Sequence, residues 1–560
     1  MLYFFRIWLS KLCEWLKSTF VTLKQGTLRG IESTLPNGNP YYSFKGVPYA
    51  VPPLGDLRFR PPVPLEKFAT DPLDCIQEGG VSFQRNPFNG EIEGGEDCLY
   101  LNIYTPNLKP KKPMAVMMWV HGGGFVYGNG NSDYYSPVYF MMEDVVILTF
   151  TYRLGIYGFL YLPDGGAPGN VGLRDQVAAF KWVKDNIHKF GGDPDNLTLF
   201  GQSAGAASIH LHALSPVSKK YFHKAIMQGG NSLMEWVLQS NPLYKARKLA
   251  ELMGCTAKTD KEIGEFLRKE DDPTKFYVHW FNILTPDELR RGLHMTFRPI
   301  VEGDVPGAII PRRPLELAMD PNSIQIPIMM GYCNKEGIGF LKADEPNIEE
   351  IDKDLARMIP RSVNLEPDDP RCLEVAEQMR QFYFKGARLT LERREEFISL
   401  LGDYHFIIWK HLAAEISSRR QHKSPFYLYR FSFDGELNYF KKNYKMIEGA
   451  CHGDDRFYLF QRSVDDGRLK PGTREELTVR RMCRMWTNFA KYGNPTPFED
   501  DLIKWKWHPV KKIGSKDEFV LDYLEINDTV RMDQNPDVDR VDFWRHIFRT
   551  WNQSFFKPKL

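Results

Sequence analysis

Three absences narrow what this sequence of 560 residues can be. After its first 20 residues it has no run of roughly 18 uninterrupted apolar residues, which excludes a helix that spans a membrane. Its 73 basic and 71 acidic residues nearly cancel, so it lacks the positive footprint of a nucleic-acid-binding protein. Its eight cysteines form no close C-x-x-C pair and no zinc-type spacing, so we expect no metal site. These absences favour a globular protein that acts on a small neutral or mixed molecule.

The first 20 residues also lack the uninterrupted apolar core of a secretory signal. Four charged residues interrupt it, namely Arg6, Lys11, Glu14 and Lys17. On a helix these side chains share one arc, and apolar residues such as Trp8 and Leu12 mostly fill the other. We therefore predict an amphipathic helix over residues 1–20 that lies in a membrane surface, with docking on its own domain as the alternative. The expected location is cytoplasmic, peripheral on an intracellular membrane.

The rest of the chain alternates short apolar runs with helical stretches, which is typical of an α/β fold. Such continuous runs suit strands that are buried on both faces of a largely parallel sheet. They occur at 113–120, 144–150, 197–200, 224–228, 326–330 and 426–433. Residues 173–190 have apolar positions at helical spacing and predict a crossover helix. We interpret the more polar residues 234–322 and 337–424 as helical insertions that cover the sheet.

The stretch LTLFGQSAGAASIH, residues 197–210, places Ser203 between a predicted strand and a predicted helix. A G-x-S-x-G match is weak alone, but this context is that of a nucleophile elbow. Such a turn forces strained torsions at the serine and leaves no room for side chains at Gly201 and Gly205. The sequence therefore predicts a nucleophilic serine, and the alternative is a structural turn.

A second glycine-rich stretch, VHGGGFVYG at residues 120–128, follows another predicted strand. Consecutive glycines leave backbone N–H groups open to a ligand, and acyl transfer needs such donors for the oxyanion. The alternatives are a flexible loop or a phosphate cradle, but neither G-x-x-x-x-G-K-[ST] nor G-x-G-x-x-G occurs at a strand–helix junction. We therefore expect an acyl hydrolase without a cofactor.

A serine hydroxyl needs a histidine to accept its proton and an acid to orient that histidine. Glu336 follows the predicted strand 326–330 and is the candidate acid, with Asp344 and Glu345 as rivals by position. His452 lies among small residues in EGACHGDDRF and is favoured as the base. The other downstream histidines include His405 and His411, which lie on helix-like sequence.

Several long stretches resemble the type-B carboxylesterase and cholinesterase family. FGGDPDNLTLFGQSAGA (190–206) and EDCLYLNIYTP (96–106) are similar to its two signatures, and FKGVPYAVPPLGDLRF and GNVGLRDQVAAFKWV extend the likeness over nearly the whole chain. The resemblance implies one α/β-hydrolase domain over residues 21–560, with a large, mostly parallel sheet flanked by helices and helical insertions. It also implies a serine carboxylesterase that acts on small ester substrates without metal or cofactor.

The resemblance assigns roles to individual residues. It implies Ser203 as nucleophile, Glu336 as acid, His452 as base, and the N–H groups of Gly123, Gly124 and Ala204 as the oxyanion hole. Trp236, Phe297 and Phe340 fall at positions that resemble the acyl pocket, although they could equally be ordinary core. The family's first disulfide maps onto Cys75 and Cys98, which would remain thiols in a reducing cytosol.

Some positions depart from the family pattern. No Trp lies between Cys75 and Cys98, so we do not expect choline esters as preferred substrates. Gln202 stands where many relatives have Glu, and the resulting GQSAG sequence is similar to that of juvenile hormone esterases. Gly229 replaces a serine that relatives often have near the triad. With its amino terminus, the chain looks most like the insect alpha-esterases. We expect broad specificity for apolar esters; the alternatives are a juvenile-hormone-esterase-like hydrolase and a non-catalytic adhesion or scaffold protein.

Overall fold

The computed structural model describes residues 17–87, 90–320, 322, 324–420, 424–463, 469–512 and 520–552. A thirteen-stranded sheet runs through them, in the order β1-β2-β3-β7-β9-β8-β12-β13-β14-β15-β16-β17, with β4 paired to β2. Its strands are β1 (Ser18–Leu23), β2 (Gly26–Thr34), β3 (Pro40–Pro48), β4 (Leu73–Asp74), β7 (Tyr100–Thr105), β8 (Met114–Val120), β9 (Val145–Phe150), β12 (Gly192–Gln202), β13 (Lys224–Gln228), β14 (Ile328–Cys333), β15 (Phe426–Phe431), β16 (Asp522–Ile526) and β17 (Arg531–Gln534).

The middle of this sheet is parallel, because each neighbouring pair from β9 through β8 and β12 to β16 runs in the same direction. Antiparallel strands close both edges. Two small sheets lie outside it and consist of β5 (Gln84–Arg85) with β6 (Ile92–Glu93) and β10 (Tyr161–Leu162) with β11 (Ala167–Pro168). All six apolar runs predicted as strands are strands, which confirms the predicted α/β-hydrolase sheet.

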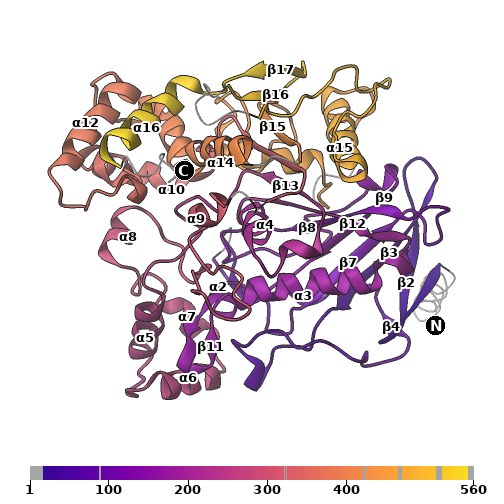
Figure 1. Ribbon diagram of the computed structural model, residues 1–560. Helices are drawn as coiled ribbons and strands as arrows, with labels where there is room; N and C mark the ends of the chain where they lie inside the picture. The colour runs from indigo at the N-terminus through magenta and orange to yellow at the C-terminus, as the bar shows by residue number, and fades with distance from the viewer. Residues whose placement is uncertain are drawn as a thin grey trace, which may run out of the picture.

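The helices cover both faces of the sheet and extend beyond it (Figure 1). They are α2 (Gly155–Phe159), α3 (Val171–Asn186), α4 (Ala204–Leu214), α5 (Pro242–Leu252), α6 (Asp260–Lys269), α7 (Thr274–Val278), α8 (Pro286–Arg290), α9 (Pro314–Ala318), α10 (Ile338–Asp344), α11 (Ile348–Lys353), α12 (Arg371–Phe384), α13 (Arg394–Gly402), α14 (Ile408–Arg420), α15 (Arg474–Tyr492) and α16 (Val538–Trp551). The predicted crossover helix is α3, which ends four residues early and continues as a 3₁₀ turn over Ile187–Phe190.

Strand β8 shows why a continuous apolar run is needed here. Every residue from Met114 to Val120 is buried, because successive side chains point to opposite faces and both faces are covered. Met118 and Val120 pack in the core that includes residues of α3 and α4, whereas Trp119 packs in the core that includes residues of α15. The sheet is therefore the middle layer of three.

The amino-terminal prediction is wrong in part. Residues 18–20 belong to β1, which pairs with β2 from Ser18 opposite Ile31, so a helix cannot continue to residue 20. Thr19, Phe20 and Val21 are β-branched or aromatic and suit an edge strand better than a helix. The remainder of the predicted helix, residues 1–16, lies outside the described residues. Among the helices that are described, none has the length and apolarity needed to cross a bilayer.

Candidate active site

Four neighbouring strands end at the same edge of the sheet and place the candidate residues there. Ser203 follows β12, Gly229 follows β13, Glu336 lies beyond β14, and the glycine-rich loop at 122–124 follows β8. In parallel sheets the carboxyl ends of the strands all meet at one edge, which is where such folds bind their ligands. The topology therefore brings together residues that are far apart in the sequence.

Ser203 is the turn between β12 and α4. Its backbone has φ 58° and ψ −123°, a conformation that residues other than Gly rarely adopt. Two hydrogen bonds hold it there, because its N–H donates to Gln228 O at 2.9 Å and its carbonyl accepts from Ala207 N at 2.9 Å. This is the strained strand–turn–helix geometry that the sequence predicted for a nucleophile elbow.

The two glycines that flank Ser203 have the steric role predicted for them. A Cβ atom at Gly201 would lie 2.5 Å from the carbonyl oxygen of Val120, and one at Gly205 would lie 1.9 Å from the same oxygen. Both distances are shorter than real Cβ contacts, so a side chain at either position would displace the end of β8. The glycines let the elbow pack against the strand that carries the glycine-rich loop.

The acid and base loops are joined by their backbones. Lys335 and Cys451 form an isolated parallel bridge, in which Lys335 N donates to Ala450 O at 3.0 Å. This pairing sets the next residues, Glu336 and His452, side by side, and His452 Nδ1 is hydrogen-bonded to Glu336 Oε2. The rivals Asp344 and Glu345 make no such contact; Glu345 accepts a hydrogen bond from the Tyr444 hydroxyl at 3.0 Å instead.

The Glu336 carboxylate is completely buried and has a second fixed partner. Its Oε1 accepts the backbone N–H of Cys333 at 2.9 Å, while Oε2 faces the imidazole. A carboxylate can only accept, so Nδ1 of His452 carries a proton and Nε2 is left as the acceptor. The imidazole is thus held in the tautomer that a general base requires.

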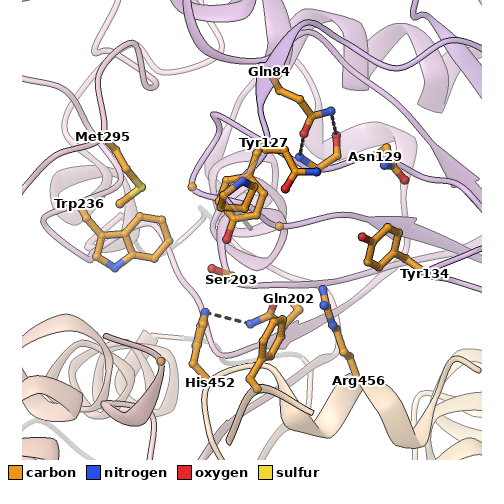
Figure 2. A pocket seen from close by; sticks show the side chains of 18 of the residues that line it. Gln84, Tyr127, Asn129, Tyr134, Gln202, Ser203, Trp236, Met295, His452 and Arg456 are labelled. Carbon is orange, nitrogen blue, oxygen red and sulfur yellow. Dashed lines mark hydrogen bonds between the residues drawn. The ribbon is translucent and has the colours of Figure 1, made fainter. Parts of the chain in front are cut away.

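His452 Nε2 is engaged by Gln202 rather than by Ser203. The side-chain nitrogen of Gln202 lies 3.0 Å from Nε2, and Figure 2 shows this contact beside Ser203. The structure records no hydrogen bond between Ser203 and His452, both of which lie in the described chain. Such bonds are often long in enzymes without substrate and tighten when substrate binds. Proton transfer from Ser203 therefore requires Nε2 to exchange Gln202 for the serine hydroxyl.

Gly229 leaves the space beside the triad to the imidazole. A Cβ atom at this position would lie 3.1 Å from His452 Cε1 and 3.4 Å from Glu336 Oε1. The ring is instead supported by Phe406, which stacks on it with ring centroids 4.3 Å apart. Lys410 is fully buried and donates to the carbonyl of Gly230 at 2.7 Å, and burial lowers the pKa of its amine to about 7.

Three backbone amides near Ser203 have no partner in the part of the protein that the structure describes: Gly123 and Gly124 line the same cavity as Ser203, and Ala204 follows it in the chain. Gly123 and Gly124 have φ 105° and 62°, and Ala204 is the first residue of α4, where an N–H has no intrahelical acceptor. Within the described ranges, none of these three N–H groups donates a hydrogen bond. This arrangement is suited to stabilising an anionic oxygen next to Ser203.

Ser203, His452, Gly123 and Gly124 line a cavity of about 240 Å³. Of the three residues expected at the acyl pocket, Trp236 and Phe340 line this cavity and Phe297 does not. Phe297 has φ 49°, is 1% exposed and packs in the core, and Met295 two residues earlier lines the cavity in its place.

Several lining residues carried no recognisable signal in the sequence. They are Gln84, Tyr127, Tyr134, His405, Phe406 and Arg456, among others. Burial lowers the pKa of His405 to about 3, so this imidazole is neutral and stacks on Phe340 with centroids 4.6 Å apart.

Cys75 and Cys98, the pair implied by the resemblance, are both buried free thiols. Among the residues described, no cluster of three or more His, Cys, Asp or Glu could hold a metal ion.

Comparison with known proteins identifies what the chain is similar to. The sequence pattern of the carboxylesterase family matches residues 17–544. Juvenile hormone esterase of Tribolium castaneum is 35% identical over 86% of this chain and 84% of that protein, and Esterase B1 of Culex pipiens is 31% identical over 95% and 98%. The crystal structure of juvenile hormone esterase from Manduca sexta, with OTFP covalently attached, superimposes with a TM-score of 0.83 at 32% identity, covering 95% of this chain and all of that one.

Proposed function

The chain belongs to the carboxylesterase family and is a carboxylic ester hydrolase, and from that premise we propose that Ser203, His452 and Glu336 carry out its chemistry. The observation that carries the assignment is the joint geometry of the strained Ser203 turn and the hydrogen bond between His452 Nδ1 and Glu336. A nucleophile, an oriented base and a buried acid meet at one edge of the sheet, which is the arrangement that acyl transfer needs.

In the first step, the Ser203 hydroxyl attacks the ester carbonyl carbon while His452 Nε2 takes the hydroxyl proton. The negative charge that develops on the carbonyl oxygen is stabilised by the N–H groups of Gly123, Gly124 and Ala204. The tetrahedral intermediate then collapses; His452 gives its proton to the departing alcohol and the acyl group stays on Ser203. Glu336 stabilises the imidazolium throughout.

In the second step, water replaces the alcohol. His452 Nε2 removes a proton from the water as it attacks the acyl-enzyme carbonyl, and the same three amides stabilise the second oxyanion. Collapse of this intermediate returns the proton to Ser203 and releases the carboxylic acid. The His452 imidazole acts first as general base and then as general acid. Both proton transfers therefore depend on the orientation in which Glu336 holds the ring.

Covalent labelling tests the nucleophile directly. A dialkyl fluorophosphate should phosphorylate Ser203, so intact-mass analysis should show one adduct on the parent protein and none on Ser203→Ala. A control in which Ser208 is replaced with alanine should be labelled like the parent, because Ser208 lies on α4, the helix that follows Ser203, but is completely buried. An adduct that persists on Ser203→Ala would show that another residue is the nucleophile.

We propose a broad range of apolar esters as substrates. In support, apolar side chains form one side of the cavity, among them Trp236, Met295, Phe340 and Phe406. The alternative is a juvenile-hormone-directed esterase, which the Tribolium and Manduca relatives and the GQSAG sequence around Gln202 favour. Measuring kcat/KM for juvenile hormone beside butyrate esters of increasing alcohol length distinguishes them, since a directed enzyme would prefer the hormone by orders of magnitude.

We further propose that residues 1–16 attach the protein to the surface of an intracellular membrane. Deletion of 1–16, which spares β1, should reduce binding to anionic liposomes while esterase activity is kept. Leu12→Glu should weaken binding, whereas Ser10→Glu adds the same charge to the polar arc and should weaken it less. Flotation of liposomes measures both, and equal binding by all variants would reject the anchor.

A further inference from the structure

The cavity around Ser203 has two chemically different sides. Figure 2 shows Trp236 and Met295 on one side of Ser203, and Tyr134 and Arg456 on the other. Phe406 and Phe340 belong to the apolar side, because the Phe406 ring centroid lies 6.0 Å from that of Trp236 and 5.5 Å from that of Phe340. In an ester attacked by Ser203, the acyl and alcohol parts diverge from the carbonyl carbon. An apolar acyl chain that occupies the Trp236 side therefore leaves the alcohol part against Arg456.

Arg456 brings a positive charge into this cavity without a carboxylate to pair with it. Among the described residues, no Asp or Glu lies within ion-pair distance of its guanidinium. The adjacent carboxylates are used elsewhere: Asp454 accepts the backbone N–H groups of Phe440 and Cys451. Asp455 accepts from Gln228 at 2.9 Å and from Tyr429 at 2.8 Å. The Arg456 side chain is half-buried, so its charge is only partly exposed to water, and no carboxylate of the described residues occupies its N–H donors; they are open to an anionic partner from outside.

Aromatic rings hold the Arg456 guanidinium in place. Its Cζ atom lies 4.8 Å from the ring centroids of Phe440 and Phe457 and 5.7 Å from that of Tyr135. The Tyr135 hydroxyl accepts from one terminal nitrogen at 3.2 Å, while Nε is buried and without a hydrogen-bond partner. Rings stabilise a cation through their faces but accept few of its N–H bonds, so donors remain for a carboxylate.

A second arginine in the same aromatic cluster provides a comparison. Arg462 stacks over Tyr439 at 3.8 Å and over Phe457 at 4.7 Å, yet it does not line the cavity. Stacking alone therefore does not place an arginine next to Ser203. Glu93, the acidic residue that lines the cavity, is exposed at the rim and is bound by Asn86 at 3.3 Å. Its charge is screened by solvent and does not neutralise Arg456.

We propose that Arg456 recognises esters whose alcohol part carries a carboxylate. This inference rests on the proposed function, and it narrows the substrates to an apolar acyl group joined to an anionic alcohol. The planar guanidinium, fixed between rings, presents parallel N–H donors that match the two oxygens of a carboxylate. Electrostatic attraction into the cavity also favours an anionic substrate over a neutral one of the same shape.

A matched pair of esters tests the proposal. 4-Carboxyphenyl butyrate is charged, and 4-carbamoylphenyl butyrate has nearly the same shape and is neutral. The ratio of their kcat/KM values is measured for the parent, Arg456→Gln, Arg456→Lys and Arg462→Gln. We expect the ratio to fall about tenfold or more in Arg456→Gln, to fall less in Arg456→Lys, and to stay unchanged in Arg462→Gln. The ratio cancels differences in expression and in the active fraction.

Other outcomes are distinguishable. If Arg456→Gln lowers both rates in parallel, the ratio stays constant; Arg456 then has a structural role and the inference is overturned. If 4-nitrophenyl hydrogen glutarate, which carries its carboxylate on the acyl part, is as sensitive to Arg456→Gln as 4-carboxyphenyl butyrate, the assignment to the alcohol side is wrong. If the parent hydrolyses none of these esters, or Ser203→Ala hydrolyses them equally well, the proposed function itself fails.

Discussion

A Glu336→Gln variant should fold normally and lose about 10⁴-fold in kcat for 4-nitrophenyl butyrate. The amide has the size of the carboxylate, but its two ends differ. The Cys333 N–H, which donates to Oε1 at 2.9 Å, requires an oxygen at that end and so turns the NH₂ group toward His452 Nδ1. Nδ1 must then accept, which moves the imidazole proton to Nε2. A protonated Nε2 cannot take the proton of Ser203.

The rival acids provide matched controls for this prediction. Asp344→Asn and Glu345→Gln remove a carboxylate from the same segment, but neither residue contacts His452 in the structure. Burial raises the pKa of Asp344 to about 6, so its removal tests whether any buried carboxyl nearby matters. We expect both variants to keep activity within about threefold of the parent, because neither carboxylate is hydrogen-bonded to His452. Glu336→Gln with more than a tenth of parental activity would refute its role as the acid.

A Gly205→Ala variant should be destabilised by about 3 kcal/mol, at the upper end of what overpacking costs. The new methyl group would lie 1.9 Å from the carbonyl oxygen of Val120, a backbone atom that cannot rotate away. Val120 is the last residue of β8 and lies two residues before the glycine-rich loop at 122–124, so a shift there also moves the amides of Gly123 and Gly124. Urea unfolding should show a lower midpoint, and the remaining folded protein should have a reduced kcat.

Gly95→Ala is the control for this change. A Cβ atom there meets no atom within 4 Å and its φ is not in the positive range, so the change in stability should stay within about 0.5 kcal/mol. A Gly205→Ala protein as stable and as active as Gly95→Ala would show that the elbow does not need its glycine.

The parts of the fold that could be predicted are those in which a local pattern has one physical explanation. The apolar run of β8 has no polar face, so it had to be a strand covered on both sides. Gly201 and Gly205 have no side chain because Val120 occupies that space, and this requirement is visible in the sequence as G-x-S-x-G.

The cavity walls could not be predicted because they come from segments without a regular period. Phe297 and Met295 lie in a stretch with no helix or strand, so nothing in the sequence decides which of the two faces the cavity. Phe406 and His405 lie in a π-helical turn, Asp403–Ile407, which changes the phase between α13 and α14. A periodicity of 3.6 residues cannot assign faces across such a turn. At the amino terminus, residues 18–20 have a helical sequence pattern but form part of a strand, because they pair with β2.

The backbone bridge between Lys335 and Cys451 has a consequence for how this enzyme could diversify. Glu336 and His452 are 116 residues apart, and the helices α10 to α14 lie between them in the chain. Because the bridge clamps the two ends of that segment, its interior can be lengthened, shortened or remodelled while the acid and the base stay in register. The same segment supplies Phe340, His405 and Phe406 to the cavity. Changes in this segment can therefore alter the substrate specificity of the cavity without disturbing the catalytic reaction.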